Sequence, residues 1–359
     1  MRPGIEPLID ILRGRDNAGE WAAMLDAAKQ ESVLPWVAER LHARNVRLNP
    51  EQRASIEAIG RDAQLAAFAW TETLKSTLSA FDRAEVPAIP LKGPCLAERL
   101  YGDAALRTCH DLDLLVRSRD LARAERVLAG LGFARSGYPE DYASAWRRNG
   151  LLLELHHNVE NPRAVDFDVD RAWNSAQRSA FQGVPVWLLA PADELLHLCI
   201  HAAHHRFDRL CLILDLALAF RRLPFTPGVI SGFCENAVVL GWAMAAQLDA
   251  EIPRPQTSLS PQEQQRLHEL ARRIWNEHLA EVPQTLDWAA SHRFYLEVET
   301  PGWKRVRRLG RDLAIQMTRL IDADFEFAER FRLRREWQAR MLRPVRLITK
   351  KVHGLVRSA

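Results

Sequence analysis

The spacing of hydrophobic side chains changes twice along the chain. Over roughly the first 85 residues, apolar positions recur every three or four residues, which predicts amphipathic helices. The apolar runs then become short and are bounded by Pro, Gly or Asp, which predicts strands at residues 86–91, 111–116 and 151–156. Helices are expected in the two intervals between these strands.

Beyond residue 190 the three-to-four spacing returns and persists towards the C-terminus. This order of elements predicts an α+β protein, in which a small mixed-sheet core of the α/β type lies between helical regions. We therefore divide the chain into an N-terminal helical region (1–84), an α/β core (85–190) and a C-terminal helical domain with a basic tail (191–359).

Composition narrows the class of protein. The chain is 47% hydrophobic and 26% charged, which is ordinary for a globular protein. Its longest apolar stretch, Leu210 to Phe220, has 11 residues and includes Asp215, whereas a membrane-spanning helix needs about 20 apolar residues. No secretory signal is recognised at the N-terminus, and the five cysteines form no C-x-x-C pair. We expect a cytoplasmic protein without a disulfide framework or a zinc ribbon.

The net charge of +3 hides a basic C-terminal tail, because residues 303–359 contain 16 Lys or Arg and 6 Asp or Glu. The most basic stretch comprises Arg330, Arg332, Arg334, Arg335, Arg340, Arg343, Arg346, Lys350 and Lys351. Apolar residues alternate with these charges, as in an amphipathic helix. Such a helix either docks on the helical domain or binds a polyanion such as nucleic acid. The regular apolar positions favour docking.

Asp111 and Asp113 are the sharpest chemical feature of the sequence. On a strand they share one face, about 6–7 Å apart, while Leu112 and Leu114 face the core. Two carboxylates side by side repel each other, and a divalent cation such as Mg²⁺ relieves that repulsion. The alternative is a solvent-exposed strand end with two incidental acids.

The third predicted strand places Glu154 and His156 on one face as well. Three converging carboxylates are suited to a pair of Mg²⁺ ions that activate a hydroxyl and stabilise a pyrophosphate leaving group. His156 is then a ligand, a partner of a ligand or a substrate contact; the alternative is a packed histidine at a strand end.

Upstream, Lys92 and Gly93 end the first predicted strand and enter a helix. A glycine there lets backbone N–H groups approach a phosphate at the helix N-terminus. Lys92 and Arg107 are candidate cations for the same phosphates.

These motifs recur in a known order: Leu91-Lys92-Gly93, Leu100-Tyr101, Leu106-Arg107, Asp111 to Val116, and Leu155-His156. In this order they resemble the uncharacterised nucleotidyltransferase family of the DNA polymerase β-like nucleotidyltransferase superfamily. The resemblance implies that Gly93 is the turn glycine, that Asp111 and Asp113 bind metal, and that Glu154 is the third carboxylate. Pro94 departs from the superfamily pattern, in which Ser or Gly is usual.

The resemblance further implies an enzyme that transfers a nucleoside monophosphate from an NTP to a hydroxyl or phosphate acceptor, with Mg²⁺ or Mn²⁺ as cofactor. Asp111, Asp113 and Glu154 are its expected catalytic and metal-binding residues. Lys92, Gly93, Arg107 and His156 are its expected nucleotide-binding residues. Neither the acceptor, the nucleobase nor the oligomeric state follows from the sequence.

Two other functions stay open. His197 and His201, followed by His204 and His205, line one stripe of a predicted helix, and Asp215 lies on the next. This stripe suits a metal-dependent phosphohydrolase, a contact to substrate, or a polar face packed between helices. The second function is a non-catalytic nucleotide-binding protein, which the loss of an N–H at Pro94 would fit.

Overall fold

The computed structural model describes most of the chain. The described residues are 2–15, 19–44, 46–137, 142–162, 164–223, 230, 232–280, 288–318, 322–329, 331, 338, 341–343 and 346. The N-terminal helices are α1 (Ile5–Leu12), α2 (Trp21–Gln30), α3 (Leu34–Ala43) and α4 (Pro50–Arg83).

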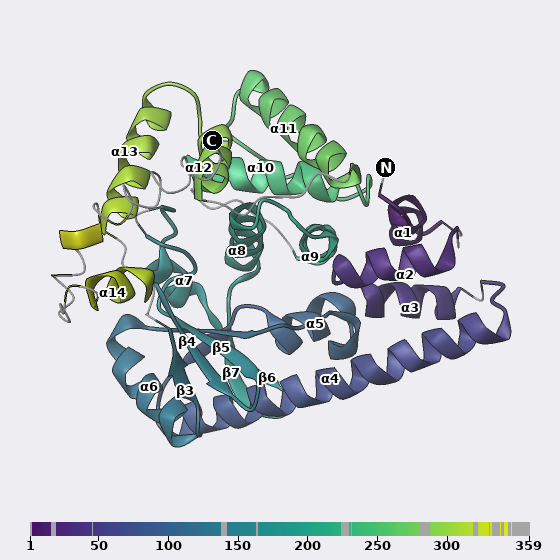
Figure 1. The fold of residues 1–359 in the computed structure, drawn as a ribbon, viewed down its shortest axis with the longest axis horizontal. Helices are drawn as coiled ribbons and strands as arrows, with labels where there is room; N and C mark the ends of the chain where they lie inside the picture. Colours follow the sequence, from purple (N-terminus) through teal and green to yellow (C-terminus); the bar gives the residue numbers. More distant parts are fainter. Residues whose placement is uncertain are drawn as a thin grey trace.

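Helix α4 is 34 residues long and runs along one edge of the molecule (Figure 1). It begins at a capping box, in which the side chains of Asn49 and Gln52 each accept a hydrogen bond from the other's backbone N–H. Its C-terminal half buries Leu74, Leu78 and Phe81 against the sheet. The helix therefore joins the N-terminal helices to the sheet.

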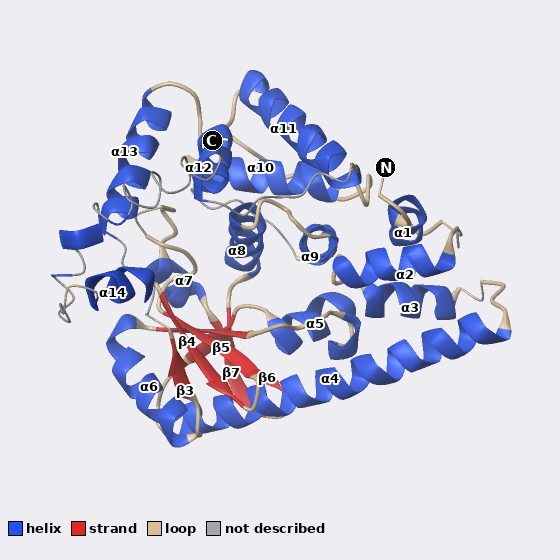
Figure 2. Ribbon diagram, in the orientation of Figure 1, coloured by secondary structure: helices blue, strands red, loops and turns tan. Residues whose placement is uncertain are grey.

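A mixed five-stranded sheet forms the core that the sequence predicted (Figure 2). Its strands are β1 (Ala88–Pro90), β2 (Leu112–Val116), β3 (Ala134–Ser136), β4 (Ala143–Arg148) and β5 (Leu151–His156). Their order is β1-β2-β5-β4-β3, and only β2 and β5 run parallel. The α+β class and the three predicted strands are confirmed.

The structure adds elements that the hydrophobic pattern did not indicate. They are β3, β4, helix α7 (Val169–Ser175) and a separate hairpin of β6 (Gln177–Phe181) and β7 (Val184–Leu188). Strand β2 begins at Leu112, so Asp111 precedes the strand on which it was expected. The first strand is also shorter than predicted, although the N–H of Leu91 still donates to the carbonyl of Asp113 at 3.0 Å.

Helices α5 (Gly93–Tyr101) and α6 (Leu121–Gly130) lie between the strands as predicted. The C-terminal helices are α8 (Pro191–His204), α9 (Leu210–Arg222), α10 (Phe233–Ala245), α11 (Pro261–Leu279), α12 (Trp288–Val298), α13 (Trp303–Thr318) and α14 (Asp322–Glu329). One hydrophobic cluster joins α1–α3 to α8–α11, and a second lies beneath the sheet. None of the helices in the described ranges has the length and apolar character needed to cross a membrane.

The basic tail is described at few positions. Arg330, Arg332, Arg334, Arg335, Arg340, Lys350 and Lys351 lie outside the described residues. Arg343 and Arg346 both form ion pairs with the buried Asp324, the second with 2.5 Å between Nε and Oδ1. The choice between docking and nucleic-acid binding stays a prediction for the tail as a whole.

Candidate active site

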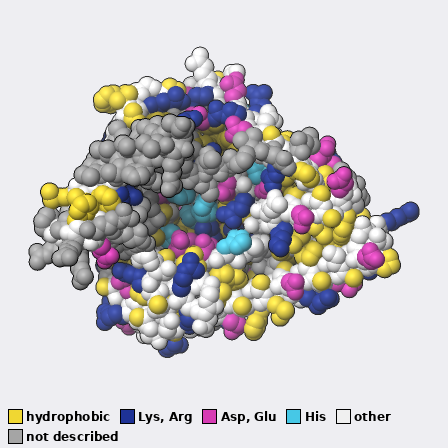
Figure 3. Space-filling model, in the orientation of Figure 1, with side chains coloured by type: hydrophobic (Ala, Val, Ile, Leu, Met, Phe, Trp, Pro, Cys, Tyr) yellow, Lys and Arg dark blue, Asp and Glu magenta, His cyan; other side chains and the backbone are white. Residues whose placement is uncertain are grey.

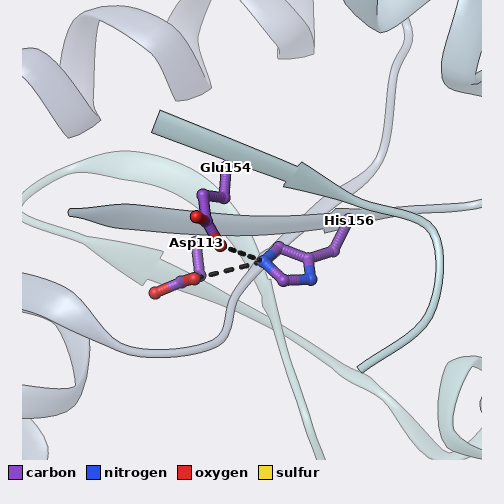
Figure 4. A group of neighbouring side chains, drawn as sticks. All are labelled: Asp113, Glu154 and His156. Carbon is purple, nitrogen blue, oxygen red and sulfur yellow. Dashed lines mark hydrogen bonds and ion pairs between the residues drawn. The ribbon is translucent and has the colours of Figure 1, made fainter. Parts of the chain in front are cut away.

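Strands β2 and β5 bring three of the predicted residues together. The parallel register sets Asp113 beside Glu154, and His156 follows two positions along on the same face. The Nε2 atom of His156 lies 3.1 Å from Oδ1 of Asp113 and 3.4 Å from Oε2 of Glu154 (Figure 4). One ligand atom from each residue lies within 4.8 Å of the others. This is a group of the size that one metal ion needs.

Lys92 connects this group to the C-terminal helices. It precedes α5, and its Nζ lies 3.1 Å from Oδ2 of Asp113 and 3.2 Å from Nε2 of His201 on α8. The Lys92 side chain is only 10% exposed, so its charge is held close to Asp113 with little screening by water. The ammonium thus lies between the sheet and α8.

A pocket of about 300 Å³ opens over these residues. Its polar lining comprises Lys92, Asp111, Asp113, Tyr142, Ser144, Glu154, His156, Glu160, His201, His204 and His205. Histidine, acidic and basic side chains gather in the middle of the face shown in Figure 3. Asp111 reaches the pocket from the residue before β2, so both aspartates of the predicted pair line it.

The charges in the pocket influence one another strongly. Burial, together with the negative charge of Asp113, raises the pKa of Asp111 to about 6. Burial also disfavours the Asp113 carboxylate, but Lys92 and His156 more than compensate and hold its pKa well below the usual range. Burial opposes protonation of His156, yet its hydrogen bonds to Asp113 and Glu154 raise its pKa to about 9.

This donor set fits a divalent cation. Carboxylate oxygens are the ligands that Mg²⁺ and Mn²⁺ prefer. Burial is the main cause of the raised pKa of Asp111, and the carboxylates of Asp113 and Glu154 add to it against the opposing charge of Lys92. In addition, the buried Oδ2 of Asp113 has no hydrogen bond of acceptable geometry, although it faces Lys92. Asp111, Asp113 and Glu154 are therefore the residues that suit a metal, with His156 directed at two of them.

Gly93 supports the turn beside the pocket rather than lining it. Its φ of +71° is in the left-handed region, where a side chain would be strained, and a Cβ would lie 3.4 Å from Leu112. Pro94 occupies the first turn of α5 and supplies no N–H. A phosphate at this helix N-terminus would have one backbone donor fewer than in the superfamily pattern.

Arg107 and Asp215 form a separate, sealed cluster. Nε and Nη2 of Arg107 each donate to Asp215 at 2.9 Å, and the hydroxyl of Tyr101 donates to the same carboxylate at 2.6 Å. Neither Arg107 nor Asp215 is among the residues that line the pocket. The structure thus places Arg107, predicted to hold phosphate, in a buried ion pair.

The histidine stripe divides between the core and the pocket. Both ring nitrogens of His197 are buried without a hydrogen-bond partner, and burial lowers its pKa to about 3. His201 lines the pocket, and burial and Lys92 hold its pKa well below the usual value. Since Asp215 is bound by Arg107, it does not complete a metal site with these histidines. Among the described residues, the ligands that converge are those on β2 and β5.

Several pocket residues were not identified from the sequence. Ser144 lies on β4, which was not predicted, and Tyr142 is the residue before that strand. Glu160 follows β5, where no sequence pattern indicates it. Oε2 of Glu160 lies 2.5 Å from Nδ1 of His204. Burial raises the pKa of Glu160, but the His204 contact outweighs burial, so the net change is downward. His204 belongs to the predicted histidine stripe, and this stripe was the one sequence signal that pointed to the α8 side of the pocket.

The mixed sheet and its flanking helices are consistent with a nucleotidyltransferase core. Residues 17–247 match the model of a family described as uncharacterised nucleotidyltransferase. The chain belongs to this family, as the motifs indicated, and is a transferase enzyme.

Two solved structures show limited similarity. The first is a crystal structure of ANT(2")-Ia in complex with adenylyl-2"-tobramycin, with 17% identity, a TM-score of 0.33, and coverage of 42% of this chain and 86% of that one. The second is a solution structure of the antibiotic-resistance factor ANT(2'')-Ia, with 14% identity, a TM-score of 0.32, and coverage of 58% and 94%. This similarity is too low to extend either protein's substrate to the present chain. A search of curated proteins finds no significant match.

Proposed function

We propose that the enzyme transfers a nucleoside monophosphate from an NTP to a hydroxyl or phosphate acceptor bound in this pocket, with Mg²⁺ or Mn²⁺. The observation that carries the proposal is the cluster of Asp113, Glu154 and His156, with Asp111 lining the same pocket. A bound divalent cation would neutralise the triphosphate and stabilise the departing pyrophosphate. Asp111, Asp113 and Glu154 would hold it.

The residues around the acids have distinct roles in this proposal. His156 donates from Nε2 towards Asp113 and Glu154, and its Nδ1 lies 3.3 Å from the carbonyl oxygen of Asn158, which orients the ring. Lys92 offsets part of the carboxylate charge when the pocket holds no substrate. Lys92 lines the same pocket as the acids, so its ammonium would also contact the phosphates of a triphosphate bound there.

The acceptor is proposed to enter on the α8 side of the pocket. His204 lies there, next to the buried Glu160, and the hydroxyl of Tyr295 is 3.0 Å from the same Nδ1 atom. A carboxylate that orients an imidazole is a common arrangement for accepting a proton from a hydroxyl group. The opposite wall carries the metal-binding acids, so donor and acceptor would be held face to face.

The direct test supplies each of the four radiolabelled NTPs to purified protein with a cell lysate, in Mg²⁺, in Mn²⁺ or in EDTA. We expect one or more NTPs to label an acceptor, with release of pyrophosphate and with complete loss of labelling in EDTA. Asp113→Asn and Glu154→Gln should abolish labelling. Asp82→Asn changes an exposed aspartate near the C-terminal end of α4. It is the matched control and should leave labelling intact.

Two further measurements on the purified protein test the two other functions. Tight NTP binding by equilibrium dialysis, with no labelled product under any condition, would favour a nucleotide-binding protein without turnover. Stoichiometric zinc, iron or manganese in the purified protein, lost on His201→Ala, would favour the phosphohydrolase. We expect neither result, because the described ligand atoms converge at β2 and β5 and not along the histidine stripe.

A further inference from the structure

A second charged concavity lies between the N-terminal and the C-terminal helices. It has a volume of about 820 Å³ and shares no lining residue with the pocket over β2 and β5. Its walls come from the ends of α1 and α3, from α9, and from the turn after α10. The charged residues that line it are Arg13, Arg15, Arg40, Arg44, Arg221 and Arg222, with Asp249 and Glu251. We call it the arginine groove.

Two of the arginines are fixed in place by groups that carry no charge. Nε and Nη2 of Arg13 donate to the carbonyl oxygen of Gln247 at 2.9 and 2.8 Å. The guanidinium of Arg40 lies 4.2 Å from the centroid of the Trp36 ring. These contacts orient the two side chains without cancelling their charge.

The acids in and near the groove neutralise only part of the positive charge. Arg221 pairs with Asp249 at 2.6 Å and approaches Glu251 at 3.8 Å, and Arg15 pairs with Asp10 at 3.2 Å. Among the described residues, neither Arg40 nor Arg222 forms an ion pair. Six guanidinium groups against two lining carboxylates leave a net positive groove.

Burial and neighbouring arginines both disfavour the charged form of two arginines in the groove. Burial and the nearby Arg15 lower the pKa of Arg13. Burial and Arg44 lower the pKa of Arg40, Glu39 opposes this change, and Arg222 adds to it. Like charges brought together in a concave site raise the local concentration of anions. An anionic ligand would relieve this repulsion.

We propose that the arginine groove is a binding site for a small anion that carries several phosphates, such as a nucleoside triphosphate or tripolyphosphate. Its volume is within the range of small-ligand sites, which is about 300–1,000 Å³. Planar guanidinium groups bind phosphate oxygens in pairs and do not lose their charge. The six arginines outnumber the two lining carboxylates by four, and by three once Asp10 is counted against Arg15, an excess that suits a ligand with several negative charges. The site is independent of the catalytic pocket and of the function proposed for it.

The test measures tripolyphosphate binding by isothermal titration calorimetry at low salt, in EDTA, which removes metal-dependent binding at the catalytic pocket. We expect the double variant Arg40→Gln, Arg222→Gln to bind about tenfold more weakly or worse, because each lost guanidinium removes charge-assisted hydrogen bonds. The double variant Arg53→Gln, Arg83→Gln, which changes two arginines of α4, is the matched control. Lys92→Met should leave this binding unchanged.

Arg222→Glu is a second variant, at a position that is exposed to solvent. It should weaken binding as well, with an unchanged circular dichroism spectrum. Equal affinities in the groove variants and the α4 control would overturn the proposal. It would be overturned likewise if Lys92→Met removed all binding, or if a single-stranded oligonucleotide bound far more tightly than tripolyphosphate and lost that binding in the groove variants.

Discussion

Two aspartates of this enzyme, Asp113 and Asp215, are equally buried but have opposite surroundings. Each is 2% exposed, and each lies next to a cation. Asp215 is bound by Arg107 and Tyr101 through both of its oxygens. Asp113 faces Lys92 and His156, lines a pocket, and keeps one oxygen without a hydrogen bond of good geometry. One carboxylate is saturated and the other is not.

The difference separates a structural from a functional buried charge. A buried ion pair whose hydrogen bonds are complete has nothing left to offer a ligand. A buried carboxylate with spare capacity, beside other acids and open to a cavity, has a reason to bind a cation. Burial and a charged neighbour, which both sites have, do not distinguish them. Four experiments test whether the two aspartates differ in this way.

The largest effect is expected at the unsaturated site. Asp113→Asn should lower nucleotidyl transfer by about a thousandfold or more, because the amide cannot neutralise a metal ion. The far-UV circular dichroism spectrum should stay unchanged. Asp215→Asn is the paired control and should retain transfer in its folded fraction. Similar transfer rates for the two variants would remove the distinction drawn here.

At the saturated site the effect should fall on stability. Asp215→Ala leaves the Arg107 guanidinium buried and unpaired, which we expect to lower the free energy of unfolding by about 3–5 kcal/mol in urea denaturation. The double variant Arg107→Leu, Asp215→Leu removes both charges and should be less destabilised than Asp215→Ala. A double variant as unstable as the single one would mean that packing, and not the unpaired charge, dominates.

A smaller effect is expected at Tyr101. Tyr101→Phe removes only the hydrogen bond to the Asp215 carboxylate and keeps the edge contact with Trp36, whose ring centroid is 5.2 Å away. The expected loss is about 2 kcal/mol of unfolding free energy, with transfer activity unchanged. Thermal and urea denaturation measure the first quantity, and the labelling assay measures the second. A clear drop in activity would connect this cluster to the pocket.

The last effect is a pH dependence of the metal-free protein. The pKa of His156 is raised from 6.5 to about 9 by Asp113 and Glu154. Its protonated form therefore adds stability that is fully present below pH 6.5 and is lost as the pH rises through about 9. His156→Gln should remove that part of the pH dependence, as followed by urea denaturation in EDTA. An unchanged profile would show that His156 is not charged in the folded state.

The sequence predicted the acids of the pocket because strand geometry fixes which side chains share a face. Because side chains alternate along a strand, Glu154 and His156 of β5 were predicted to lie on one face. The apolar neighbours of Asp113 predicted that its strand is buried. The parallel register that sets Asp113 beside Glu154 depends on contacts distant in sequence, so it could not be derived. The prediction of Asp111 within the strand was wrong by one residue, a usual uncertainty at the end of an element.

Other elements lacked a readable pattern. Strands β4 and β6 carry charged and small residues, and β6 is exposed along most of its length, so hydrophobic alternation does not mark them. Arg107 lies four residues before Asp111, and nothing in that spacing indicates that its side chain pairs with α9. Glu160 became a candidate only when the chain after β5 was seen to approach α8.

The position of Lys92 has a consequence for protein engineering. Its ammonium touches Asp113 on the sheet and His201 on α8, so the two walls of the pocket share one charged group. A fragment that ends before α8 would keep every predicted metal-binding acid, yet it would lose His201, His204 and His205 from the pocket lining. The smallest unit worth expressing for catalysis therefore extends beyond α8 to include His205, even though the acids that suit the metal lie in the sheet and its adjoining turn.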